Sequence, residues 1–149
     1  MINLNEITFV ITTFKSENII FNCLKELPEQ SPKIIIENSG NKKLKIELEK
    51  QFKNLKCFVM HENLGYGSAN NIGISESKTN YVFIINPDTL IKKSDLKFFL
   101  SKIMFEDFSI ASVLEKNDQN TYSFDIKNIK EVNFVKGFAM LINKKKMFG

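Results

Sequence analysis

Apolar positions along the chain fall into two alternating patterns, and each pattern predicts a different kind of element. Short apolar runs without polar alternation are typical of strands buried on both faces of a parallel sheet. Four such runs are Ile7–Thr13, Lys33–Glu37, Lys56–His61 and Tyr81–Ile85. The segments between them carry apolar residues at three- and four-residue steps, which predict amphipathic helices.

Hydroxyl side chains that can cap a helix stand at Ser16, Ser68 and Ser94. Helical spacing of apolar residues predicts helices at residues 19–27, 42–55, 68–75 and 96–103. Strands that alternate with helices in this way predict right-handed βαβ units and a mostly parallel central sheet flanked by helices.

The rest of the chain predicts shorter elements. A fifth strand is expected at Ile110–Leu114, a turn at Asn117–Asn120, extended pieces at Tyr122–Phe124 and Val132–Lys136, and an apolar run at Phe138–Ile142. Because no repeat, linker or composition shift interrupts the sequence, we expect a single α/β domain over residues 1–149.

Each of the four predicted strands ends in polar residues. These ends are Thr12 and Thr13, Glu37 to Ser39, Glu62 and Asn63, and Asn86 to Thr89. Parallel strands place their carboxyl ends on one edge of the sheet, where ligands of open α/β folds bind. Pro87 forces the chain out of the sheet and leaves Asp88 on a turn at that edge. A carboxylate there suits a hard cation such as Mg²⁺ together with substrate phosphates, although the tetrapeptide alone also fits a plain turn.

Composition narrows the classes of partner. Hydrophobic residues make up 43% and charged residues 26%, which are ordinary values for a globular protein. The net charge of +4 could indicate nucleic acid, but all 21 basic residues are lysines. Without arginine the chain lacks the bidentate fork that reads guanine and grips phosphate, so no nucleic-acid partner is expected.

Cysteine usage and the N-terminus bear on location. Cys23 and Cys57 lie in apolar settings typical of buried thiols, which suits a reducing compartment such as the cytoplasm. The N-terminus has no basic leader, and no apolar run reaches the length of a membrane span. Peripheral attachment at the inner face of a membrane stays open.

Several nucleotide-binding motifs are absent. A dinucleotide site needs GxGxxG after the first strand, where this chain reads TTFKSEN. The nearest match, Gly65 to Asn70, lacks the third glycine and follows the third strand. A P-loop, the glycine-rich loop of nucleotidylyltransferases and the acidic pair of response-regulator receivers are also missing from their expected places.

Four segments together resemble the family 2 glycosyltransferases with the GT-A fold. They are the TTF that ends the first strand, Glu37 to Ser39, ENLGYGSANNIGI at Glu62–Ile74, and FIINPDT at Phe83–Thr89. The rhamnosyltransferase-like branch is the most similar, since it has NPDT where other members have an aspartate-x-aspartate motif. Phe134–Phe148 also resembles a later strand of the family, so the resemblance covers nearly the whole chain.

The resemblance implies a nucleotide-sugar site. Glu37 stands where the family has an acidic residue, more often aspartate, that contacts the base, and Thr13 with its neighbours would lie under the base and ribose. Asn71 and Gly73 belong to a segment that shapes the nucleotide pocket, and Asn70 stands where some members have arginine. Asp88 would be the ligand of Mg²⁺ or Mn²⁺, with Asn86 at the degenerate first position of the metal motif. The full set of expected nucleotide-sugar residues is Thr12, Thr13, Phe14, Glu37, Asn38, Ser39, Asn63, Gly65, Asn71, Asn86 and Asp88.

Other candidate residues favour structural roles. A lone histidine at the end of a buried strand is more often structural than a ligand, so His61 is expected to be structural. The run Lys144 to Lys146 is expected to be a solvated helix start.

The resemblance also implies a reaction, in which an acceptor hydroxyl displaces the nucleoside diphosphate of a UDP- or dTDP-sugar with inversion. The family's catalytic base lies beyond the segment matching Phe134–Phe148, and the sequence stops at Gly149. Asp107, Asp118, Asp125 and Glu131 are not in that context. We therefore expect donor binding and little or no sugar transfer by this chain alone, in the synthesis of a polysaccharide or another glycoconjugate. The alternative is a non-catalytic binding or assembly domain derived from a glycosyltransferase. The donor sugar, the glycan or lipid-linked acceptor and a homo-oligomeric state stay open.

Overall fold

The protein is an α/β domain built on one six-stranded sheet. The computed structural model describes residues 2–113, 129, 131–135 and 137–149. The strands are β1 (Ile7–Thr13), β2 (Lys33–Glu37), β3 (Leu55–Val59), β4 (Tyr81–Ile85), β5 (Ile110–Ser112) and β6 (Ala139–Asn143). The helices are the 3₁₀ turn η1 (Leu4–Glu6), α1 (Ile20–Glu26), α2 (Lys42–Gln51), α3 (Tyr66–Glu76), α4 (Lys93–Ile103) and α5 (Lys144–Phe148).

The strand order is β3-β2-β1-β4-β6-β5. β1 pairs in parallel with β2 and β4, and β2 pairs in parallel with β3. β6 runs antiparallel to both β4 and β5. The predicted parallel sheet is therefore confirmed for the first four strands, whose carboxyl ends share one edge.

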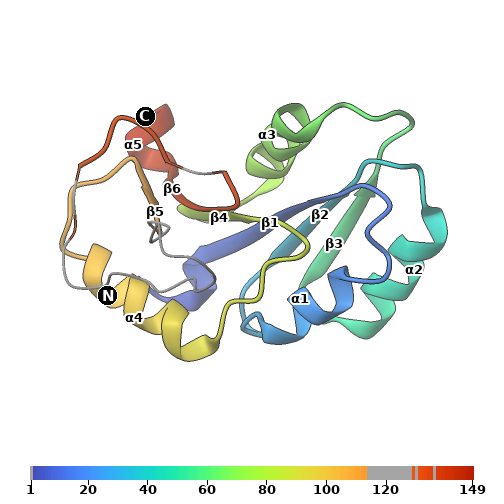
Figure 1. The fold of residues 1–149 in the computed structure, drawn as a ribbon, viewed down its shortest axis with the longest axis horizontal. Coiled ribbons are helices and arrows are strands. Elements are labelled where there is room, and N and C mark those ends of the chain that lie inside the picture. Colours follow the sequence, from blue (N-terminus) through green and yellow to red (C-terminus); the bar gives the residue numbers. More distant parts are fainter. Residues whose placement is uncertain (1, 114–128, 130, 136) are drawn as a thin grey trace, which may run out of the picture.

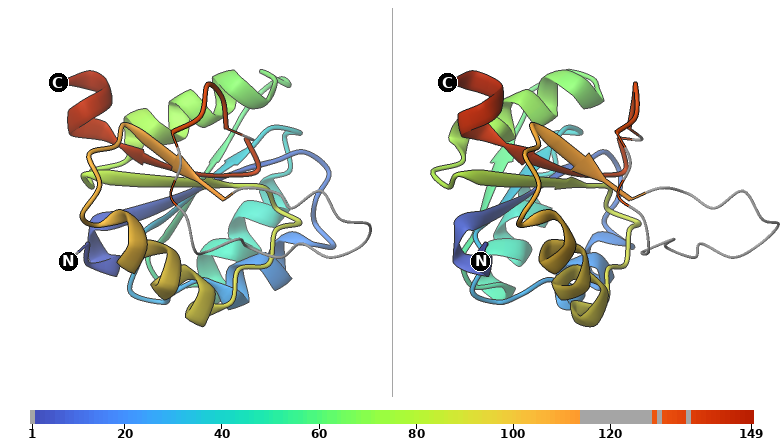
Figure 2. Two further views of the ribbon diagram at one scale, coloured as in Figure 1. Left: turned by 60° about the vertical axis from the view of Figure 1, so that its left-hand side comes forward. Right: turned by 90° about the vertical axis from the view of Figure 1, so that its left-hand side faces the viewer.

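Helices cover both faces of the sheet, as Figures 1 and 2 show: α1, α2 and α4 lie on one side, with α3 and α5 on the other. Apolar side chains of β1, β2 and β4 alternate between the two layers because successive strand residues face opposite sides. Phe9 and Ile11 of β1 pack with the first layer, and Val10 packs with α3. β1, β2 and the last four residues of β4 are buried throughout, as their unbroken apolar patterns predict.

The free edge of β3 is closed by side chains of α2. Glu49 accepts the N–H of Cys57 at 2.8 Å, and Lys45 donates to the Cys57 carbonyl at 2.7 Å. Lys45 and Glu49 also pair with each other at 3.4 Å. Side chains therefore take the place of a neighbouring strand, which protects this edge from pairing with another chain.

All three predicted serine caps are wrong. The hydroxyl of Ser16 bonds to the backbone of Phe14, and α1 begins at Ile20. α3 begins at Tyr66 after Gly65, and α4 begins at Lys93, so Ser68 and Ser94 lie inside their helices. Ser94 donates to Asp95 at 3.1 Å instead of capping.

Other predicted boundaries also shift. α2 ends at Gln51 and β3 spans Leu55–Val59, so the apolar Leu55 belongs to the strand although it continues the helical spacing. β5 and β6 confirm the strand and the apolar run expected in the last third of the chain. The described part of residues 132–136 contains no strand, and the expected elements at 117–120 and 122–124 lie outside the described residues. Among the residues described, no helix is long and apolar enough to cross a bilayer.

Candidate functional site

The predicted site residues gather at the carboxyl edge of the parallel strands. Thr13 of β1 lies beside Glu37 of β2 in the sheet register, and the N–H of Asn38 donates to the Thr13 carbonyl at 2.8 Å. β4 flanks β1 on its other side and leads into Asn86 and Asp88. The topology therefore brings together side chains that are far apart in the sequence.

The carboxylate of Glu37 is committed to its own loop. Its side chain is fully buried, and it accepts the N–H and the hydroxyl of Ser39 at 3.1 and 2.5 Å and the N–H of Asn41 at 2.6 Å. Both carboxylate oxygens are occupied by loop donors. In this conformation Glu37 therefore holds the loop of residues 38–41, and its contact with a base stays a prediction.

The side chain of Asn38 joins two loops of the site. Its amide nitrogen donates to the Asn63 side chain at 2.8 Å, and its amide oxygen accepts the N–H of Leu64 at 3.0 Å. Asn63 also accepts the N–H of Gly65 at 2.9 Å. Gly65 is the N-cap of α3 with φ 77°, a left-handed conformation that favours glycine. Asn38, Asn63 and Gly65 therefore set the position of the first turn of α3.

α3 lies against β1 through one polar and one close apolar contact. The hydroxyl of Thr12 donates to the side chain of Asn70 at 2.8 Å, and both residues are buried. A Cβ on Gly73 would lie 2.3 Å from a methyl group of Val10, so glycine is required for this helix to approach the strand. Gly73 thus acts through helix packing, and Asn71, one turn into the helix, is exposed.

Two buried polar atoms at this edge lack a hydrogen-bond partner among the described residues. They are the hydroxyl oxygen of Thr13 and the side-chain oxygen of Asn86. A buried polar atom without a partner is costly to stability and uncommon in native proteins. Such atoms at the ends of two adjacent strands indicate a place where a ligand supplies the missing bonds.

Asp88 is exposed in the turn after β4. Its negative charge affects the pKa of one residue in α1 and one in α3. Burial raises the pKa of the Cys23 thiol in α1 to about 12, and Asp88 adds to that rise. Burial also raises the pKa of Tyr66 at the start of α3; a hydrogen bond from Asn70 opposes the rise and Asp88 adds to it. Asp88 therefore stands close enough to act on both α1 and α3.

The donor set suits a metal that is held jointly with a ligand. No group of three or more His, Cys, Asp or Glu side chains that could hold a metal occurs in the described part of the chain. The exposed carboxylate of Asp88 and the unpartnered oxygen of Asn86 are hard donors of the kind that Mg²⁺ and Mn²⁺ prefer. These groups fit a cation whose remaining ligands are water and phosphate.

Phe14 follows β1 with its ring 47% exposed. The ammonium group of Lys15 lies 5.5 Å from the centre of that ring. An exposed ring beside the strand end offers a flat apolar surface on which a base can stack.

One further expectation is wrong and a second is confirmed in part, since α5 begins at Lys144 and both Lys145 and Lys146 are exposed. His61 is exposed beyond the end of β3, so it is not a structural histidine within a buried strand. Lys144 is not simply solvated, because its ammonium group donates to the Ile74 and Ser77 carbonyls at the end of α3 at 3.3 and 2.7 Å. Lys146 is exposed and pairs with Asp107.

Of the other candidate carboxylates, Asp107 lies away from the site. Asp107 lies between α4 and β5, and thus at the opposite edge of the sheet from Asp88. Glu131 is exposed, whereas Asp118 and Asp125 lie outside the described residues.

Sequence reasoning missed the role of Tyr66. Its hydroxyl donates to the carbonyl of Gly137 at 2.6 Å, which joins residues 71 positions apart. The aromatic residue between Gly65 and Gly67 was the available signal, but nothing in the sequence indicates that its partner is the carbonyl of Gly137.

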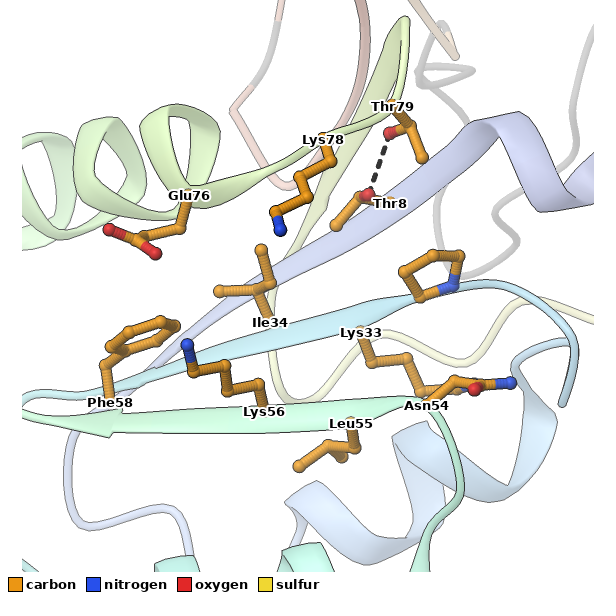
Figure 3. A pocket seen from close by; sticks show the side chains of 11 residues that line it. Thr8, Lys33, Ile34, Asn54, Leu55, Lys56, Phe58, Glu76, Lys78 and Thr79 are labelled. Carbon is orange, nitrogen blue, oxygen red and sulfur yellow. Dashed lines mark hydrogen bonds between the residues drawn. The ribbon is translucent and has the colours of Figure 1, made fainter.

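A hollow of about 390 Å³ lies elsewhere, near the amino ends of β1, β2 and β3 (Figure 3). Ile34 and Phe58 form part of its lining, and the side chains of Lys56 and Lys78 extend over them. None of the residues expected to bind a nucleotide sugar lines this hollow.

The chain is similar in sequence to a teichoic acid polymerase and in fold to two proteins of known structure. It is 27% identical over 135 residues to the teichoic acid poly(glycerol phosphate) polymerase of Staphylococcus epidermidis, covering 85% of this chain and 19% of that protein. The structure matches S. aureus TarS 1–349 with a TM-score of 0.71 at 19% identity, covering 93% of this chain and 47% of TarS 1–349. It matches the mannosyltransferase PcManGT of Pyrobaculum calidifontis with a TM-score of 0.70 at 14% identity, covering 97% of this chain and 47% of that one.

These structural matches confirm the predicted GT-A fold, while the chain spans less than half of each protein compared. The family model of glycosyl transferase family 2 matches residues 8–147. This range contains the six strands of the sheet apart from the first residue of β1, and it contains α5 apart from its last residue. With nearly the whole chain matched, the protein belongs to glycosyltransferase family 2.

Proposed function

We propose that the carboxyl edge of the sheet binds a nucleoside-diphosphate sugar together with Mg²⁺ or Mn²⁺, as the donor site of a glycosyltransferase. The observation that carries the proposal is the meeting of two unpartnered buried oxygens, on Thr13 and Asn86, with the exposed carboxylate of Asp88. Related folds support it, since TarS is known in complex with UDP-GlcNAc and PcManGT with GDP-Man and Mn²⁺.

Each group at this edge has a proposed role. Phe14 stacks on the base, and Thr12 and Thr13 lie under the base and ribose. Ser39, Asn63 and Asn71 supply polar contacts, while Glu37, Asn38 and Gly65 keep the loops in place for them. The base preference is proposed to be uracil or thymine.

Asp88 and Asn86 are the proposed protein ligands of the metal. When bound, the cation would neutralise negative charge on the departing diphosphate. One carboxylate gives weak intrinsic affinity for a divalent cation, so the diphosphate must contribute ligands of its own. We therefore expect metal and nucleotide to bind with strong mutual dependence.

The transfer itself is proposed at the level of the family. The acceptor is a hydroxyl of a glycan or a lipid-linked carrier, the configuration at the anomeric carbon inverts, and the sugar is a hexose or rhamnose. Incubation of the chain with UDP- and dTDP-sugars, with NMR detection of released and transferred sugar, tests these points. Turnover by this chain alone would contradict the non-catalytic alternative, whereas donor binding without turnover is expected under both hypotheses.

Calorimetry with UDP and dTDP, with and without Mn²⁺, tests donor binding. We expect Asp88→Ala to weaken Mn²⁺–UDP binding about 10- to 100-fold, which corresponds to the loss of a charged contact of roughly 1.5–3 kcal/mol. Asp107→Ala is the matched control, because that carboxylate is exposed at the opposite edge of the sheet. Equal UDP affinity with and without Mn²⁺, or equal effects of the two variants, would contradict the assignment of Asp88.

A further inference from the structure

Hydrogen bonds tie α3 to β1 and to the segment that enters β6. Thr12 of β1 donates to Asn70 of α3 at 2.8 Å. Tyr66, in the first turn of α3, donates to the Gly137 carbonyl at 2.6 Å. The helix is therefore bonded both to a buried strand end and to the residues just before β6.

The residue after Gly137 bonds to the start of the turn that carries Asp88. The carbonyl of Phe138 accepts the N–H of Asn86 at 3.1 Å. Residues 137 and 138 are thus held by Tyr66 on one side and hold Asn86 on the other. Asp88 lies two positions beyond Asn86, in a turn closed by a 3.1 Å bond from the Thr89 N–H to the Asn86 carbonyl.

Tyr66 has little structural reason to be a tyrosine. Its side chain is 42% exposed, so its ring contributes only modestly to the core. A Cβ on Gly137 would meet the ring at an ordinary 3.8 Å, so the ring and residue 137 are not tightly interlocked. What a phenylalanine could not supply is the hydroxyl that donates to Gly137.

We propose that Tyr66 is a positioning residue of the donor site: by fixing residues 137 and 138, it holds the Asn86–Asp88 turn in the orientation that receives the metal–diphosphate. This inference rests on the donor function proposed above. The bond to Gly137 acts on Asp88 through the backbone of the neighbouring strand and not through contact with the ligand. Its loss therefore affects the metal-dependent part of the binding free energy.

The test compares Tyr66→Phe with Tyr81→Phe, which removes a hydroxyl at the amino end of β4. Calorimetry measures the Kd of UDP with and without Mn²⁺, and a thermal melt measures Tm. Tyr66→Phe is expected to weaken Mn²⁺–UDP binding about two- to tenfold, the effect of one hydrogen bond. UDP without metal should bind within about twofold of wild type, and Tm should shift no more than in Tyr81→Phe.

Two additional readouts separate positioning from general stability. Amide hydrogen exchange at Asn86 should be faster in Tyr66→Phe and unchanged in Tyr81→Phe. In an Asp88→Ala background, Tyr66→Phe should weaken Mn²⁺–UDP binding by a smaller factor than in wild type, because only Asn86 remains of the two metal ligands that it positions.

The outcomes are distinguishable. If wild type binds Mn²⁺–UDP and Tyr66→Phe binds it equally well, the positioning role is overturned while the donor function stands. If metal-free and metal-bound UDP weaken together with a fall in Tm, the role is general packing and the inference is also overturned. If wild type binds no UDP in either condition, the donor function and this inference both fall.

Discussion

The amino and carboxyl edges of the parallel strands differ in how far their buried polar groups are hydrogen-bonded within the chain. At the amino edge, the buried ammonium of Lys33 donates to the carbonyls of Pro28, Glu29 and Ser31 at 2.9, 3.3 and 2.9 Å. The hydroxyls of Thr8 and Thr79 bond to each other at 2.7 Å, and Lys144 caps the end of α3. At the carboxyl edge, Thr13 and Asn86 keep buried oxygens that no described residue satisfies.

The chain itself satisfies the polar groups named at the amino edge, and we propose that a ligand satisfies the two free oxygens at the carboxyl edge. Satisfied groups stabilise the fold, whereas unsatisfied buried groups reduce stability and are retained where binding needs them. Substitutions at the amino edge should therefore change stability and leave binding intact, and substitutions of the free groups at the carboxyl edge should do the reverse.

The largest expected effect is at Lys33. Lys33→Met keeps the length of the side chain but removes the three hydrogen bonds from its ammonium group to the backbone carbonyls. We expect a loss of about 3 kcal/mol in the free energy of unfolding, measured by urea denaturation. The Kd of Mn²⁺–UDP for the folded variant should match wild type; a weaker Kd would mean that the amino edge takes part in binding.

Glu37 tests this comparison, because its carboxylate lies at the carboxyl edge but is fully hydrogen-bonded within the chain. Glu37→Ala removes the acceptor of the Ser39 and Asn41 N–H groups, so we expect a loss of about 2 kcal/mol in stability. UDP binding should weaken as well, since the loop of residues 38–41 loses its anchor. Unchanged stability with lost binding would instead indicate that the carboxylate serves the base directly.

The affinity for the metal should depend on whether the nucleotide is bound. Without UDP, the protein should bind Mn²⁺ at least about tenfold more weakly than with saturating UDP, because a single carboxylate is a poor site on its own. Electron paramagnetic resonance of free Mn²⁺ measures both affinities. Tight binding of Mn²⁺ alone would require ligands beyond Asp88 and Asn86.

Thr13 should show a smaller effect of opposite sign. Thr13→Val keeps the shape and removes the unpartnered hydroxyl, so stability should stay equal or rise by up to about 1 kcal/mol. Mn²⁺–UDP binding should weaken about threefold to tenfold if the ligand uses this hydroxyl. Lower stability of the variant would show that the hydroxyl has a partner within the protein.

The smallest effect concerns the two thiols. Burial raises the pKa of Cys23 and of Cys57 to about 12, so both stay protonated and unreactive at neutral pH. Labelling with a thiol reagent at pH 8 should therefore be slow in the folded protein and fast in urea. Rapid labelling of the folded protein would contradict the burial of both residues.

The strands could be predicted because their apolar runs depend only on burial. β1, β2 and β4 match their predicted bounds, and the polar strand ends do meet at one edge. The helix starts could not be predicted from single serines. A hydroxyl can bond to whichever backbone or carboxylate is near, as at Ser16 and Ser94, and α3 starts where Gly65 turns the chain.

The gathering of the candidate residues at one edge of the sheet could be predicted, but their hydrogen bonds could not. The sequence indicated two acidic residues at strand ends, Glu37 and Asp88. In the structure Glu37 is buried, whereas Asp88 is exposed. The capture of Glu37 by Ser39 and Asn41 depends on the path of a loop, and the bond from Tyr66 to Gly137 depends on distant strands meeting. Such contacts follow from tertiary structure and leave no local pattern in the sequence.

The central claim is that the carboxyl edge, and not the amino edge, receives the ligand. A titration of ¹⁵N-labelled protein with Mg²⁺–UDP, followed by amide chemical shifts, tests it most directly. We predict the largest shifts at Thr13, Asn38 and Asp88, with Lys33, Thr79 and Lys144 unchanged. Shifts concentrated at the amino edge, or no saturable shifts at all, would contradict this account.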